Sequence, residues 1–285
     1  MDITPAARCI AQFVTERLRT RERFPYIVGI CGAQGSGKST ACDQLISILG
    51  ERGLRAATLA LDDIYLSAAD RAALAAKVHP LLKTRGVPGT HEVQLGIDLL
   101  QRARQQQAFL VPRFDKACDD RAPPEIWTHI DTPLDVVLFE GWCVGARPQL
   151  PEELVEPTND LERRDDPNRI WRTYANERLA SEYQALFSYL DALVLLAAPN
   201  FEVVAGWRKQ QEHALRDRLL SQGLDASGAM SDAQIDRFVQ HYERLTRHIL
   251  KEMPSRADLM LRLSADRTVT GISNGAHRVP REQDL

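Results

Sequence analysis

Eight consecutive residues near the start of the chain form a pattern that is typical of phosphate binding. They match G-x-x-x-x-G-K-[ST] and are Gly32, Ala33, Gln34, Gly35, Ser36, Gly37, Lys38 and Ser39. Glycines allow backbone angles that point successive N–H groups into one concavity, and the helix that follows directs its positive end to the same place. Lys38 can then reach the β- and γ-phosphates of a nucleotide, and the Ser39 hydroxyl can coordinate Mg²⁺. We therefore expect these residues, together with Thr40, to bind ATP.

Acidic residues follow two further apolar segments. Asp62 and Asp63 come after residues 55–61, and Glu140 lies near the end of residues 134–142. Because ligands of open α/β sheets bind beyond the carboxyl ends of the strands, these acids should lie at the same edge as the phosphate pattern. A carboxylate can accept the proton of an attacking hydroxyl, or hold Mg²⁺ directly or through water. We assign Asp62 as the candidate base and Glu140 to the Mg²⁺ side; Asp63 could take either role.

Each acidic assignment has a plainer alternative. Asp62 and Asp63 can form a pair at a helix N-terminus, where the helix dipole favours negative charge. Glu140, which precedes Gly141, can be a turn residue at a solvated edge. The phosphate pattern favours the functional interpretation, since a kinase often places an acid where it orients the attacking hydroxyl.

Apolar periodicity predicts the elements that must position these residues. Short apolar runs predict strands over residues 25–32, 55–61, 109–114, 134–142, 191–199 and 257–263. Apolar residues at helical spacing predict helices over residues 5–19, 38–50, 67–77, 92–104, 170–189, 200–220 and 231–252. The alternation of strands and helices indicates an α/β domain with a mainly parallel sheet. We expect the three-layer α/β/α fold of P-loop NTPases with a helical lid.

The same pattern predicts the domain organisation. We expect a single kinase domain over residues 1–267, with lid and substrate insertions at about 65–130 and 200–252. Residues 151–168 are acidic and irregular and are interpreted as a surface loop. Residues 268–285 lack an apolar pattern and are expected to form a flexible tail.

The composition is that of an ordinary globular protein. The chain has 285 residues and a formal net charge of -3, a balance that argues against a nucleic-acid-binding surface. Its five cysteines show no CxxC spacing, which favours free thiols in a reducing compartment. Residues 1–20 lack the apolar core of a secretory signal, and no apolar run is long enough to predict a membrane span. We expect a cytoplasmic protein without membrane or nucleic-acid partners.

Several segments resemble the D-glycerate 3-kinase family of P-loop kinases, a branch similar to uridine kinase, pantothenate kinase and phosphoribulokinase. The segments, which share the order and spacing of that family over residues 25–263, are LDDIYL, LLKTRGVPGTHE, PRFDKACDDRAP, DVVLFEGWCVG, WRKQQEHALR and AMSDAQIDRFVQHY. The resemblance implies an ATP-dependent kinase in which Asp62 is the proton acceptor. The chain departs from the family where only three residues separate Lys116 from Asp120, and where Phe114 replaces an expected tyrosine.

The resemblance also implies an acceptor-binding side of the site. Its members are Asp62, Tyr65, Arg85, His91, Lys116 and Arg121. The cations suit the carboxylate of a small anionic acceptor, and an arginine can bind it through two parallel bonds. His91 can hydrogen-bond a hydroxyl. As alternatives, His91 is an exposed loop residue, and Lys116 and Arg121 pair with neighbouring aspartates on the surface.

A basic helical segment supplies candidate lid residues. Phosphoryl transfer gains from cations that close over the developing charge and exclude water. Arg208, Arg216 and Arg218 lie in such a segment. The alternative is a solvated basic face in which these arginines pair with Glu212 and Asp217.

Three classes of function fit these observations. The leading one is a kinase that transfers the γ-phosphoryl group of ATP, with Mg²⁺, to a hydroxyl of D-glycerate. A second is a kinase for another acceptor, such as a nucleoside, a pantothenate-like molecule or a different hydroxy acid. The third is a P-loop NTPase that acts as a switch or assembly factor. The charged stretch over residues 81–121 favours a true acceptor site.

Overall fold

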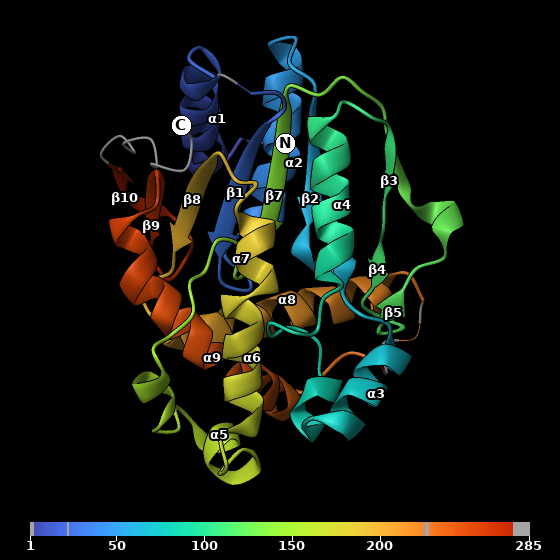
Figure 1. The fold of residues 1–285 in the computed structure, drawn as a ribbon, viewed down its shortest axis with the longest axis vertical. Coiled ribbons are helices and arrows are strands. Elements are labelled where there is room, and N and C mark those ends of the chain that lie inside the picture. Colours follow the sequence, from blue (N-terminus) through green and yellow to red (C-terminus); the bar gives the residue numbers. More distant parts are fainter. Residues whose placement is uncertain (1–2, 22, 224, 226–227, 276–285) are drawn as a thin grey trace.

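The core of the protein is a mostly parallel six-stranded sheet (Figure 1). The computed structural model describes residues 3–21, 23–223, 225 and 228–275. In sheet order the strands are β10 (Val269–Asn274), β9 (Leu259–Leu263), β8 (Ala192–Ala197), β1 (Tyr26–Gly32), β7 (Val136–Gly141) and β2 (Ala56–Ala60). Each neighbouring pair is parallel except β10 and β9, which are antiparallel. The expected α/β class is therefore confirmed.

Helices cover both faces of the sheet and complete three layers. One face carries α1 (Pro5–Leu18) and α2 (Lys38–Glu51), and the other carries α4 (Val93–Arg104) and α7 (Glu182–Phe187). Side chains alternate along β1, so Val28 packs with the first pair of helices and Ile27 with the second. Parallel strands are buried on both faces in this way, which explains why they read as continuous apolar runs.

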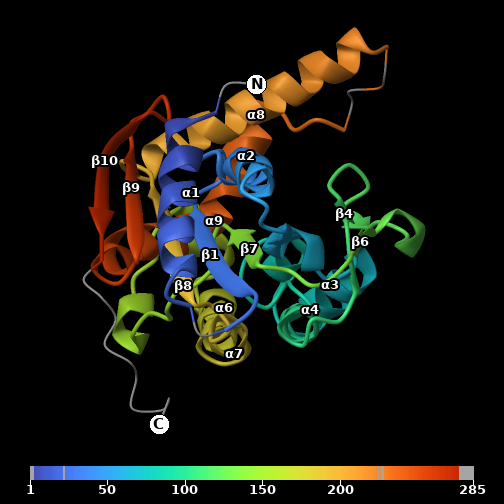
Figure 2. The same cartoon turned by 90° about the horizontal axis from the view of Figure 1, so that it is seen from above.

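The remaining elements lie mainly beyond the carboxyl ends of the strands. They are α3 (Ala68–Lys77), β3 (Phe109–Val111), β4 (Phe114–Asp115), β5 (Asp120–Arg121), β6 (Thr128–Ile130), α5 (Asp160–Asp165), α6 (Ile170–Ala180), α8 (Glu202–Ser221) and α9 (Asp232–Glu252). Strand β3 pairs with β6, and β4 pairs with β5, as two small antiparallel sheets. Helix α8 crosses below the main sheet in Figure 1 and extends outward from the molecule in Figure 2.

Several predicted boundaries differ from the structure. The helix expected over 170–189 is divided at Ser181, whose backbone angles are not helical. The strand expected over 109–114 stops before Pro112, which has no N–H to donate to a ladder. The segment interpreted as a loop over 151–168 contains α5, which begins at the capping side chain of Asn159.

The prediction of a flexible tail is wrong for the residues that the structure describes there. Residues 269–274 form β10, which pairs with β9 at the edge of the sheet. Its residues alternate between half-buried and exposed, so the strand has too few apolar residues to be recognised from sequence. Residues 276–285 lie outside the described part of the chain.

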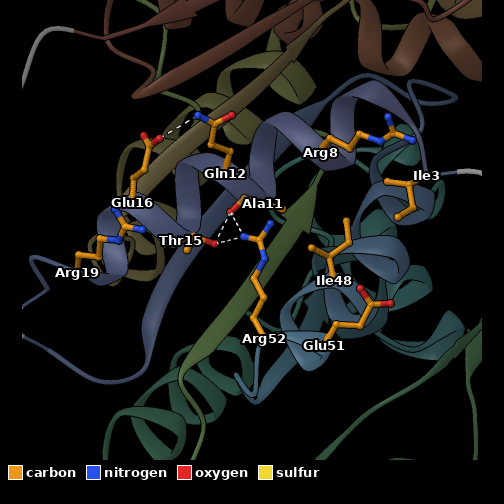
Figure 3. A pocket seen from close by; sticks show the side chains of 10 residues that line it. All are labelled: Ile3, Arg8, Ala11, Gln12, Thr15, Glu16, Arg19, Ile48, Glu51 and Arg52. Carbon is orange, nitrogen blue, oxygen red and sulfur yellow. Dashed lines mark hydrogen bonds between the residues drawn. The ribbon is translucent and has the colours of Figure 1, made fainter.

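Among the described residues, no helix has the length and apolar character needed to cross a membrane. Figure 3 shows a groove between α1 and α2, where Arg52 donates to Ala11 and Thr15. The α2 residues of this groove lie about 15 Å or more along the helix from Lys38, so it is separate from the phosphate pattern.

Candidate active site

The phosphate pattern forms the turn between β1 and α2. Gly35 and Gly37 have φ angles of 76° and 89°, in the left-handed region that favours glycine. Helix α2 begins at Lys38, so its first N–H groups face the turn. The Ser36 hydroxyl is buried and has no hydrogen-bond partner, which leaves a free donor inside the turn. This is the geometry of an anion cradle, and nucleotide binding by these residues stays a prediction.

The strand register brings the acids to this turn. Glu140 of β7 lies between Ile30 of β1 and Ala60 of β2. Ile30 stands two residues before Gly32, and Ala60 stands two residues before Asp62. The three strand ends are therefore level, and the two acids lie on the same side of the phosphate turn, in β7 and just after the neighbouring strand β2.

Glu140 faces the start of α2. The Ser39 hydroxyl donates to the Glu140 carboxylate at 2.8 Å, and the Lys38 ammonium donates to the Ala33 carbonyl at 3.2 Å. Glu140 is only 8% exposed. Burial raises the pKa of Glu140, and the nearby Lys38 charge opposes this shift.

Asp62 lies beside both the phosphate turn and the acceptor segments. Its carboxylate accepts from the Lys116 ammonium at 2.7 Å and from the Tyr65 hydroxyl at 2.9 Å. Burial alone would raise the pKa of Asp62, but the Lys116 and Lys38 charges and the Tyr65 hydrogen bond outweigh it. The resulting pKa lies well below the usual range, so the carboxylate is ionised.

Asp63 forms hydrogen bonds with other residues than Asp62 does. Its two carboxylate oxygens accept from the Phe114 N–H at 3.1 Å and from Arg113 at 3.0 Å. Burial raises its pKa, and these bonds oppose the rise. Asp63 thus anchors β4 to the end of β2, and the structure does not bring it to the Ser39–Glu140 pair.

His91 is buried, so the alternative of an exposed loop residue is wrong. It is 3% exposed, and its ring stacks on Tyr65 with centroids 4.4 Å apart. The Tyr183 hydroxyl accepts from the Gly89 N–H at 3.0 Å and contacts the His91 Nδ1 at 2.5 Å. Burial lowers the pKa of His91 to about 3, so the ring is neutral. Its Nε2 has no partner within the described structure.

The acceptor-side cations are paired in this structure. Lys116 pairs with Asp62, and Arg121 bonds to Glu92 at 2.6 Å and to the Tyr65 carbonyl at 3.0 Å. Arg85 pairs with Asp119. The alternative of pairing with neighbouring aspartates is wrong for Lys116 and Arg121, because their partners are Asp62 and Glu92.

The candidate lid arginines have different surroundings. Arg208 pairs with the buried Glu212 at 2.6 Å, as the alternative interpretation expects. Arg216 donates to the Met230 carbonyl at 2.8 Å and so connects α8 to the segment before α9. Arg218 is exposed. The latter two lie about 12 Å and 15 Å beyond Arg208 along the helix, and so farther from Trp207, the α8 residue that packs against Gly35.

Sequence reasoning missed Arg267 at the nucleotide side. Its Nε donates to the Gly35 carbonyl at 2.5 Å, and its guanidinium stacks over Trp207 with 5.2 Å between them. The Trp207 indole N–H donates to the Ala265 carbonyl at 2.6 Å. Arg267 lies within the turn after β9, a segment that carries no recognisable motif. Its one available signal was its position after a strand of a parallel sheet.

The fold and the site define a P-loop phosphotransferase, and comparison with known proteins refines that class. The family model described as "Methylmalonyl Co-A mutase-associated GTPase MeaB" matches residues 3–67, which is the part that contains the phosphate turn. The chain is 32% identical over 243 residues to the "Uncharacterized kinase mug58" of Schizosaccharomyces pombe, covering 82% of this chain and 83% of that protein.

Two further relatives carry a more specific name. The chain is 31% identical over 228 residues to the chloroplastic D-glycerate 3-kinase of Arabidopsis thaliana, of which it spans 46%; the match covers 76% of this chain. It also resembles the solved D-glycerate 3-kinase of Cryptococcus neoformans var. grubii, with 26% identity, a TM-score of 0.78, and coverage of 95% and 99% of the two chains. The chain belongs to the D-glycerate 3-kinase-like family of P-loop kinases.

Proposed function

We propose that the protein transfers the γ-phosphoryl group of ATP to a hydroxyl of D-glycerate. The observation that carries the proposal is Asp62, an ionised carboxylate next to Lys38 of the phosphate turn and Lys116 of the acceptor segments. A switch NTPase needs no proton acceptor that faces such cations. The names of two relatives favour D-glycerate over other hydroxyl acceptors.

In this proposal each residue has a separate task. The turn amides and Lys38 bind the phosphates and stabilise the charge that develops on them. Asp62 orients the acceptor hydroxyl and takes its proton as the new bond to phosphorus forms. Tyr65 holds the Asp62 carboxylate through their hydrogen bond. His91 has a buried Nε2 without a partner in the described structure, and in this proposal that atom hydrogen-bonds the acceptor.

Ser39, at the start of α2, and Glu140, in β7, are suitable Mg²⁺ ligands. Mg²⁺ prefers oxygen ligands and usually takes one or two protein groups, with the rest from phosphates and water. Ser39 and Glu140 offer a hydroxyl and a carboxylate that already contact each other. When bound, the ion would neutralise negative charge on the phosphates.

We also propose that the protein is located in the cytoplasm.

An acceptor screen tests the reaction. Purified protein is incubated with Mg-ATP and D-glycerate, other hydroxy acids, pantothenate, or nucleosides, and ADP release is measured. We expect ADP release to depend on an acceptor and to be highest with D-glycerate. A higher rate with a nucleoside would show that the acceptor is a nucleoside and not D-glycerate, and would still support a kinase.

The switch NTPase is the second candidate, and one observation favours it. The sequence match over residues 3–67 is to a family described as a GTPase. Equal nucleotide hydrolysis with and without every acceptor would support this candidate, and a preference for GTP over ATP would strengthen it.

A further inference from the structure

A single carboxylate lies between two arginines beside the acceptor segments. Asp119 belongs to the turn between β4 and β5, with φ at 54°. Its Oδ2 accepts from Arg71 at 2.6 Å, and its Oδ1 pairs with Arg85. The side chain of Asp119 is 48% exposed, whereas that of Arg71 is 1% exposed. An exposed carboxylate thus occupies a cationic site that is itself buried.

Arg71 is held mainly by parts of the protein other than this turn, and it also donates to the Asp119 carbonyl at 2.9 Å. Arg71 donates to the carbonyls of Leu66 and Lys83 at 2.8 and 3.2 Å. The Arg85 carbonyl accepts from Tyr242 at 2.9 Å. Both guanidinium groups lie over the ring of Phe114, which belongs to β4 next to this turn, at 5.6 and 5.5 Å. Arg71 is therefore preorganised, and its buried charge next to that of Arg85 favours an anion between the two.

The same turn also covers the candidate base. Lys116 stands three residues before Asp119, and its ammonium bonds to Asp62 at 2.7 Å. The ring of Phe114 packs against Tyr65 at 5.2 Å, on the side where Tyr65 binds Asp62. One short turn therefore fills both the cationic site and the position next to the base.

We propose that Arg71 and Arg85 form the carboxylate site of the acceptor, and that Asp119 occupies it in the free enzyme. This inference rests on the proposed kinase function and narrows the acceptor to small hydroxy acids. Acceptor binding exchanges one carboxylate for another, so the arginines stay paired throughout. Asp119 then moves into solvent, to which it is already half exposed, and the turn that carries Lys116 uncovers Asp62.

Substitution of Asp119 tests the exchange. Asn tolerates the left-handed backbone of this position and removes the charge. We expect Asp119→Asn to lower the KM for D-glycerate by about tenfold, because a competing anion is lost. The KM for its neutral amide, D-glyceramide, should change less than twofold. Asp115→Asn is the matched control, since it removes one charge from the same turn and Asp115 bonds to backbone amides of Ala117 and Cys118.

Substitution of Arg85 should have the opposite effect on D-glycerate, because it removes a cation of the proposed site. We expect Arg85→Gln to lower kcat/KM for D-glycerate by about a hundredfold and to leave that for D-glyceramide within a few-fold, because charge-assisted bonds to a carboxylate are lost. Arg71 is unsuitable, since its bonds to backbone carbonyls also hold the fold together. Opposite effects of the two variants on the acid, and small effects on the amide, would support the proposal.

Other outcomes would overturn it. If Asp119→Asn lowers the KM of acid and amide equally, the turn only obstructs the site and does not imitate a carboxylate. No change for the acid would show that the pair is merely structural. If the native enzyme releases ADP at the same rate without any acceptor, the kinase function fails separately. Calorimetric titration with D-glycerate then tests whether Arg71 and Arg85 bind its carboxylate. Tighter binding by Asp119→Asn than by the native protein supports this site, and no binding by either protein refutes it.

Discussion

Asp62 shows how its neighbours set the state of one functional group. Burial opposes ionisation of this carboxylate, and the cations Lys116 and Lys38 overcome that effect. The residue type and its position after β2 were predictable, because strand ends of a parallel sheet meet at one edge. The pairing with Lys116 was not, since 54 residues separate the partners and no local pattern records their contact.

Lys38 gives the first prediction at this scale. Its ammonium makes a single hydrogen bond, to Ala33, in the described structure. Lys38→Ala should therefore fold normally and lose about a hundredfold or more in kcat, because a charge that stabilises the transferring phosphoryl group is removed. Steady-state ADP release and thermal unfolding measure the two effects. Lys77→Ala, on the exposed side of α3, is the control. Retention of near-full activity by Lys38→Ala would refute the role.

Buried histidines give a prediction on pH. Burial lowers the pKa of His91 to about 3 and that of His241 to about 4, so the folded state binds fewer protons than the unfolded state below pH 6.5. The contribution of the two neutral histidines to the free energy of unfolding should be fully present above pH 6.5. Below that pH it should fall by about 1.4 kcal/mol per histidine for each pH unit. Urea unfolding at pH 7.5, 6.0 and 5.0 measures this slope.

A variant separates the two histidines. His91→Gln should lower stability at pH 7.5, because the contacts with Tyr65 and Tyr183 are weakened, yet it should reduce the pH slope by about half. His129→Gln, on the exposed surface, is the control. An unchanged slope in His91→Gln would contradict a neutral, buried His91.

At the scale of elements, the phosphate turn and α8 are in direct contact. A Cβ atom at Gly35 would lie 2.6 Å from the Cβ of Trp207, whereas one at Gly37 would meet nothing within 4 Å. Sequence motifs explain the glycines through the needs of the phosphate. The structure adds a second reason for Gly35, which is the close packing of a helix that lies more than 160 residues away in the sequence.

Two glycine variants test this packing. Gly35→Ala and Gly37→Ala both place a methyl group at a positive φ, which costs about 1–2 kcal/mol. Gly35→Ala should cost about 1–3 kcal/mol more in the free energy of unfolding, because it also overpacks the contact with Trp207. Urea denaturation compares them. Equal destabilisation would show that α8 moves freely away from the turn.

Element prediction succeeded where one local pattern is sufficient. The strands β1 and β7 and the helices α2 and α9 carry strong apolar periodicity, and their predicted bounds agree with the structure to within a few residues. Strand β10 was missed because its apolar residues are few and its pairing with β9 leaves no local sequence pattern. The break at Ser181 was missed because apolar residues continue through it at helical spacing.

At the scale of the whole molecule, one edge of the sheet gathers the working groups. The phosphate turn, Glu140 and Asp62 come from three adjacent strands, and their convergence follows from the parallel topology. The acceptor side is less predictable, because it depends on contacts between loops. Arg71 is buried in the middle of a helical pattern, and nothing in that pattern marks it as a partner of Asp119.

The account rests on Asp62 acting as a base on an acceptor hydroxyl beside bound nucleotide. The direct measurement is kcat for ADP release with saturating D-glycerate, and calorimetric affinity for ATP, in the native enzyme and in Asp62→Asn. We predict a fall in kcat of about 10²- to 10⁴-fold with ATP affinity nearly unchanged. A fall in ATP affinity with kcat preserved would contradict the account and assign Asp62 to the nucleotide and metal side of the site.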